Sequence, residues 1–179
     1  MRVLLIVFFA ALTSGASAQC PKNPEISQEL EQAYRTLKFA KFPRDAQAAT
    51  DVLWRLWTRA PDDRAQLMLN RGMMNLRLGD LAAAEGLLTA LIEYCPNYAE
   101  GYNQRAFARY LAGNFQGALP DLVHTLSIQP RHLGALSGKG LTHLALGQSE
   151  LAAIEFQKEL ALNPFAADRD LILNLGTDL

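Results

Sequence analysis

The chain has 179 residues, of which half are hydrophobic and a fifth are charged, and its formal net charge is -1. This balance is typical of a folded globular protein and excludes a disordered one. No excess of Lys and Arg is present to neutralise phosphate groups, so we do not expect a nucleic-acid partner. The two cysteines are too few for a disulfide scaffold or for a zinc site built on thiolates.

The first 18 residues have the layout of a secretory signal peptide. Arg2 precedes an apolar run over residues 3–12, and the small residues Ala16 and Ala18 stand where such a signal is cut. A helix of ten residues spans about 15 Å, half of the hydrocarbon core of a bilayer, so we do not expect a permanent membrane span. We therefore expect residues 1–18 to be cleaved and the protein to be exported, periplasmic and soluble. An uncleaved anchor or a buried N-terminal helix is the alternative.

Cys20 follows the expected cleavage site directly after Gln19. The region resembles a lipoprotein signal only loosely, because Gln19 stands where that signal has a small residue, so a lipid anchor on Cys20 is the lesser alternative. Thiols tend to oxidise outside the cytosol, which makes Cys20 and Cys95 a candidate disulfide. Two unpaired thiols remain the other interpretation, since sequence alone does not show that they are close together.

Residues 19–64 carry two apolar faces with helical spacing. The first lies between Ile26 and Leu37, the second lies between Ala46 and Trp57, and a proline at position 43 separates them. We predict a divergent N-terminal helical pair, which is either a cap or a degenerate copy of the units that follow.

Residues 65–166 repeat with a period of 34. One column of glycines suits the C-terminal end of a first helix, two columns of small residues let two helices approach closely, and one column of prolines ends the second helix. Each of the units 65–98, 99–132 and 133–166 is therefore predicted to be helix, turn, helix. These four columns are Gly79, Gly113 and Gly147; Gly72, Ala106 and Gly140; Ala84, Ala118 and Ala152; and Pro96, Pro130 and Pro164.

The three units resemble tetratricopeptide repeats, and the whole chain is similar to the small exported members of that family in Gram-negative bacteria. The resemblance implies an all-α fold, a right-handed α-solenoid of three full repeats with the N-terminal pair before them and a short capping helix over residues 167–179. The chain departs from the family pattern near the middle of each first helix, where Asn75, Arg109 and His143 replace the usual aromatic residue.

No pattern typical of catalysis or of metal binding is present. The histidines His124, His132 and His143 lack the spacing of a helical metal site. Asp121 and Glu155 are single carboxylates on separate repeats, so a paired acid–base site is not indicated. We expect no enzymatic activity, no cofactor and no metal.

The resemblance implies a concave groove lined by the first helices of the repeats, and a protein segment as its occupant. An apolar floor suits an amphipathic helix or an extended apolar segment, while the polar residues would hydrogen-bond its backbone. Of the positions that hold a C-terminal carboxylate in some family members, only Asn103 keeps a suitable residue. The residues expected in the groove are Leu69, Asn70, Met73, Leu76, Arg77, Asn103, Gln104, Phe107, Tyr110, Leu141 and Leu144.

The sequence therefore predicts a non-enzymatic adaptor or assembly chaperone of the cell envelope. Two other functions stay open, a carrier of an apolar small molecule in the same groove and a self-associating structural subunit. The groove is either open or filled by the terminal helices of the chain itself. Arg71, Arg105 and Arg109 are interpreted as structural cations that pair with nearby carboxylates.

Overall fold

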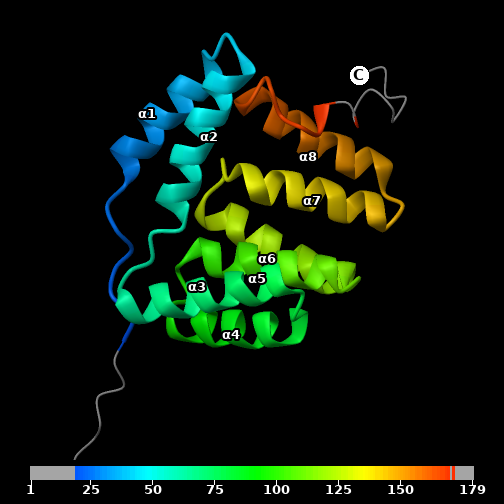
Figure 1. The fold of residues 1–179 in the computed structure, drawn as a ribbon. Coiled ribbons are helices and arrows are strands. Elements are labelled where there is room, and N and C mark those ends of the chain that lie inside the picture. Colours follow the sequence, from blue (N-terminus) through cyan, green and yellow to red (C-terminus); the bar gives the residue numbers. More distant parts are fainter. Residues whose placement is uncertain (1–18, 170, 172–179) are drawn as a thin grey trace, which may run out of the picture.

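The computed structural model describes residues 19–169 and 171, which form eight α-helices and no strand (Figure 1). The all-α prediction is confirmed. The predicted signal peptide, residues 1–18, and most of the predicted capping helix, residues 167–179, lie outside the described residues. The helices are α1 (Ser27–Lys38), α2 (Pro43–Trp57), α3 (Asp63–Leu78), α4 (Leu81–Tyr94), α5 (Ala99–Leu111), α6 (Phe115–Ile128), α7 (Leu133–Ala145) and α8 (Ser149–Leu162).

Three helical pairs, α3–α4, α5–α6 and α7–α8, are layered on one another, as Figure 1 shows. Each turn inside a pair contains a glycine of the 34-residue column, and Gly79, the first of them, has φ of 77°. This left-handed backbone is strained for residues with a Cβ atom, which explains the glycine. In the first two pairs the turn ends at a capping side chain, since Asp80 accepts from the backbone N–H of Ala83 and Asn114 accepts from that of Gly117.

The columns of small residues mark close contacts between the two helices of a pair. A Cβ atom added at Gly140 would lie 2.4 Å from Cε1 of Phe156, and one added at Gly72 would lie 2.8 Å from Cγ of Leu88. These distances are far below van der Waals contact, so α7 and α3 hold their partner helices closer than an alanine would allow.

The N-terminal pair α1–α2 does not stack on α3 as a fourth repeat in register would. It packs across the other end of the array, where Tyr34 donates its hydroxyl to the carbonyl of Arg131 at 2.6 Å and α1 contacts α8. Leu133 belongs to the core of this pair, and Leu162 and Phe165 pack against that core. The pair is therefore a cap that joins the beginning of the described chain to its last repeat. Among the described helices, α3 contacts mainly α4 and α5.

Ion pairs connect the two helices of a repeat at equivalent positions. Arg105 donates two hydrogen bonds to Asp121, at 2.8 and 2.7 Å, and Lys139 donates one to Glu155 at 2.9 Å, 34 residues further along. Hydrogen bonding to Asp121 raises the pKa of the Arg105 guanidinium. Arg109 also bonds Asp121, at 2.9 Å, and so Arg105 and Arg109 are structural cations in this fold. Arg71 occupies the same repeat position but is exposed, with a leucine at the position of the carboxylate.

The segment before α1 is attached to α4. Cys20 and Cys95 form a disulfide with Cα atoms 5.1 Å apart, and the side-chain amide of Asn23 donates to the carbonyl of Asn97 at 2.7 Å. Because Cys95 directly follows α4, this segment is held along the first repeat while α1 and α2 cross to the last one.

The segment after α8 is held by Asp168, which accepts a hydrogen bond from the hydroxyl of Ser137 on α7. Burial raises the pKa of Glu159 to about 8, and the neighbouring Asp168 contributes to the shift. Glu159 is therefore protonated in the folded state at neutral pH, whereas the same carboxyl in an unfolded chain titrates near its ordinary value.

We expect the free energy of unfolding to fall as pH rises from about 4.5 to about 8. A raised carboxyl pKa means that the folded state binds the proton more tightly, so its stabilisation is complete below the unfolded pKa and lost as pH passes the folded one. The loss should be roughly 1–3 kcal/mol, since partial hydration of the carboxylate reduces the full effect. Urea unfolding at several pH values measures it. A Glu159→Gln variant with the same pH profile as the wild type would contradict this assignment.

Candidate functional site

A groove of about 630 Å³ lies along the first helices α3, α5 and α7, with α2 at one end. Phe107 and Leu111 of α5 are 49% and 45% exposed there, which is unusual for large apolar side chains on a packed helix. Within the described residues no helix fills the groove, and α2 contributes only Trp54 to its lining. Its large apolar lining residues are Trp54, Met73, Leu76, Phe107, Tyr110, Leu111, Leu122 and Leu141.

The polar floor of the groove consists of Asn103 and Gln104 of α5. Beneath them lies a buried carboxylate, that of Glu100, which is 1% exposed. Its oxygens accept hydrogen bonds from the side-chain amides of Gln104, at 2.6 Å, and Asn103, at 3.2 Å, and they lie 2.9 Å from Nε2 of His132. The other ring nitrogen of His132 accepts from the backbone N–H of Ala135, so Nε2 carries the proton and donates to Glu100. A buried charge is thus satisfied by three donors.

This arrangement fixes which atoms of Asn103 and Gln104 are available to a ligand. A carboxylate only accepts hydrogen bonds, so both NH2 groups must face Glu100. The two amide oxygens make no hydrogen bond in the described part of the chain, neither is among the buried atoms that lack a partner, and both residues line the groove. The polar part of the floor therefore presents hydrogen-bond acceptors.

Eight of the residues expected in the groove are brought together there, and three are not. Leu69 is a correction, since it is fully buried between α3 and α4 in one cluster with Ala60 and Tyr98. Asn70 is exposed and is not part of the lining, and its side-chain oxygen accepts from the amide of Gln66 at 3.1 Å. Leu144 is half-buried outside the lining. The eight residues that do line the groove are Met73, Leu76, Arg77, Asn103, Gln104, Phe107, Tyr110 and Leu141.

Trp54 lines the groove although it comes from outside the repeats, so the repeat register could not indicate it. Leu122 of the second helix α6 also lines the groove and was not expected there. The sequence does contain one indication of this tryptophan. Gly134 of α7 occupies a repeat position that faces the groove, where a residue with a side chain is expected. A Cβ atom at Gly134 would lie 2.7 Å from Cη2 of Trp54, so the glycine makes room for the indole ring. Gly138, one turn further along α7, also lines the groove.

Neither a metal site nor a membrane span is found in the part of the chain that the structure describes. Its residues form no group of three or more His, Cys, Asp or Glu side chains placed to hold a metal ion. None of its helices combines the length and the hydropathy needed to cross a bilayer.

Comparison with known sequences gives relatives that are named for the same repeat. A TPR repeat-containing protein of Rhizobium etli is 29% identical over 142 residues, which are 79% of this chain and 69% of that protein. Tetratricopeptide repeat protein 36 of Danio rerio is 33% identical over 109 residues. This second match covers 58% of our chain and 58% of the Danio rerio protein, which is less than two thirds of that relative's length. No protein-family model matches the chain.

Among solved structures, the first TPR domain of Spaghetti (RPAP3), bound to an HSP90 peptide, superposes with a TM-score of 0.61. The superposition covers 64% of this chain and 92% of that domain, and the sequences are 20% identical over it. This similarity shows that the two proteins share a fold. The 34-residue period, the three layered helical pairs and these relatives agree with one another. The chain is therefore a tetratricopeptide repeat protein.

Proposed function

We propose that this protein is a non-enzymatic interaction module that binds a segment of another protein in the groove along α3, α5 and α7. The observation that carries the proposal is the pair of exposed apolar side chains Phe107 and Leu111 beside the half-buried Met73, all lining one groove. Aromatic and methionine side chains in a concave apolar surface are typical anchors for an amphipathic helix or an extended apolar segment.

The polar floor defines the chemistry of that segment. Asn103 and Gln104 offer acceptor oxygens above the buried anionic Glu100, so the complementary ligand brings N–H groups or a positive charge. The solved Spaghetti domain binds the HSP90 peptide SRMEEVD, which is acidic. Here only Arg77 adds a cation to the lining, and the amide nitrogens of Asn103 and Gln104 both bond Glu100. An apolar segment with cationic or N–H donor groups fits better than an acidic C-terminus.

Two features support an adaptor or assembly chaperone that is exported to the periplasm. Residues 1–18 have the order of a secretory signal, with a basic end, a short apolar run and small residues before the cut. The disulfide between Cys20 and Cys95 is of a kind that persists in oxidising compartments and is rare in the cytosol.

Binding of a defined peptide tests the groove. The probe is a 16-residue amphipathic helix with leucines on one face and lysines at its edges, labelled for fluorescence anisotropy. We expect Phe107→Ser combined with Leu111→Ser to weaken binding at least about tenfold, because two anchors lose their apolar area. Val123→Ser combined with Ile154→Ser is the matched control, since these exposed residues lie on α6 and α8 outside the groove lining.

Two comparisons would contradict the proposed function. Equal affinity of the groove variant and the control variant would exclude the groove as the binding site. Tighter binding of SRMEEVD than of the lysine-edged peptide would show that the groove prefers an acidic ligand, contrary to the acceptor floor.

The volume of the groove favours one second candidate, a carrier of an apolar small molecule. About 630 Å³ lies within the range of pockets that hold small ligands. Native mass spectrometry of protein purified from its own source distinguishes the two functions, because a carrier would retain a bound mass of several hundred daltons.

A further inference from the structure

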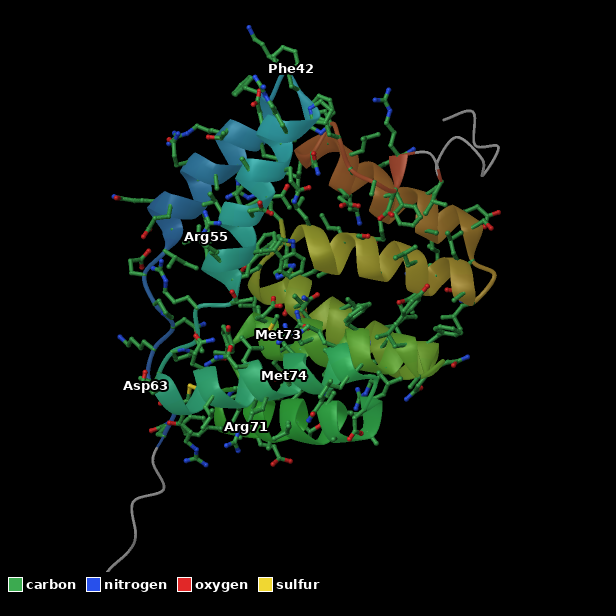
Figure 2. The ribbon with its side chains drawn as sticks, viewed as in Figure 1. Phe42, Arg55, Asp63, Arg71, Met73 and Met74 are labelled. Carbon is green, nitrogen blue, oxygen red and sulfur yellow. A yellow bond between two sulfur atoms is a disulfide. The ribbon has the colours of Figure 1, made fainter. Side chains whose placement is uncertain are left out.

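The turn between α1 and α2 exposes two phenylalanines at the outer end of the cap. Phe39 is 73% exposed and Phe42 is 56% exposed. Figure 2 shows Phe42 at the extreme end of the α1–α2 hairpin, pointing away from the rest of the molecule. Single exposed apolar residues are ordinary, but two aromatic side chains in one turn form an apolar tip that is not part of the core of the pair.

The stretch of chain that carries the two rings is rich in positive charge. The segment from Ala33 to Arg44 contains four exposed cations, Arg35, Lys38, Lys41 and Arg44, and no acidic residue, although the whole chain has a net charge of -1. The guanidinium of Arg44 lies 5.6 Å from the centre of the Phe42 ring, so cation and ring are presented together. The nearest acid along the chain is Asp45, which lies 3.5 Å from Arg44. We call Lys38, Phe39, Lys41, Phe42 and Arg44 the basic–aromatic tip.

The tip and the groove are separate surfaces. Trp54 borders the groove near the C-terminal end of α2, whereas Phe42 precedes the first residue of that helix. Trp54 follows Phe42 by twelve positions in the sequence, which corresponds to about 18 Å along a helix axis. The tip protrudes, and none of its residues lines the groove.

We propose that the basic–aromatic tip docks on an anionic lipid surface. Aromatic rings partition into the boundary between headgroups and acyl chains, and cations beside them bind lipid phosphates. Each Lys or Arg near an anionic leaflet strengthens binding about fivefold, so the charges and the rings act together. A protruding end with alternating rings and cations can enter the headgroup region of an anionic bilayer. A folded protein partner would instead need a surface complementary in shape to this end.

Co-sedimentation with vesicles tests this proposal. The probes are vesicles of phosphatidylcholine with 30% phosphatidylglycerol, and vesicles of phosphatidylcholine alone, with the full chain in every sample so that any contribution of residues 1–18 is common. We expect binding to the anionic vesicles that weakens with added salt. Lys38→Gln with Lys41→Gln should reduce the partition coefficient at least about tenfold, and Phe39→Ser with Phe42→Ser should do the same.

Leu67→Ser with Met74→Ser is the matched control, because it removes two exposed apolar residues from α3 instead of the turn. Equal loss in this control, or unchanged binding in the Phe39→Ser/Phe42→Ser variant, would overturn the proposal. So would a wild-type chain that ignores anionic vesicles but self-associates through the tip in light scattering. The peptide assay on the groove does not depend on any of these outcomes.

Discussion

Replacing His132 with alanine should lower the free energy of unfolding by about 3–5 kcal/mol. The ring is fully buried, Nε2 donates to Glu100 at 2.9 Å, and Nδ1 accepts the N–H of Ala135 at the start of α7. It also stacks on the ring of Trp57, with centroids 3.9 Å apart. The His132→Ala substitution therefore leaves a buried carboxylate with fewer donors and removes the cap of α7 and the contact to α2 at once.

Chemical denaturation followed by circular dichroism measures this loss. His124→Ala is the control, because this histidine is exposed on α6 and should change the unfolding free energy by less than about 1 kcal/mol. In a Glu100→Gln background His132→Ala should cost less than in the wild type, since no charge is left without its donor. An equal cost in both backgrounds would show that stacking and capping, rather than the buried charge, make His132 important.

Loss of the disulfide should lower the unfolding free energy by about 4 kcal/mol. The bond closes a loop between residues that are 75 apart in sequence, and a loop of this length restricts the unfolded chain strongly. Urea unfolding with and without a reductant measures the effect. Cys20→Ser is preferable to a change at Cys95, because Cys95 is buried and a hydroxyl there would add a separate cost.

The control for this second experiment is the Cys20→Ser variant itself, whose unfolding midpoint should not respond to reductant. If the wild type also keeps its midpoint when reduced, the attachment of the arm to α4 does not contribute to stability. If reduction separates the unfolding into two transitions, the N-terminal pair depends on the bond more than the repeats do.

The repeats could be predicted from the sequence because each column has a local cause. Gly79 is needed where the backbone turns left-handed, and Gly140 is needed where Phe156 approaches. The position of α1–α2 could not be predicted in this way. Its apolar faces specify two amphipathic helices but not the surface that they cover, and this surface is formed by contacts such as Tyr34 with Arg131, 97 residues apart.

The lining of the groove could be predicted only in part. Helical periodicity sets some of its residues, whereas others depend on contacts between distant parts of the chain. Repeat positions place Phe107 and Tyr110 on the inner side of α5, because that side is set by helical periodicity. They do not show that Leu69 is buried in one cluster with Ala60 and Tyr98, or that Trp54 enters from another helix. Asn103 was expected to offer hydrogen bonds, but only the buried Glu100 determines that it offers its oxygen and not its NH2 group.

In an open array of helical pairs each repeat contacts only its neighbours, and the rotation from one repeat to the next sets the curvature of the whole array. In this protein the α1–α2 pair contacts the last repeat through α8 and through the stacking of Trp57 on His132, while the carbonyl of Trp57 accepts the hydroxyl of Tyr98 before α5. The pair therefore connects the last repeat with the start of the preceding one. Such a connection between the two repeats would limit how far the groove widens or narrows. The proposed binding of a segment in the groove would then cost the protein less ordering entropy than binding by an array whose repeats are not connected in this way.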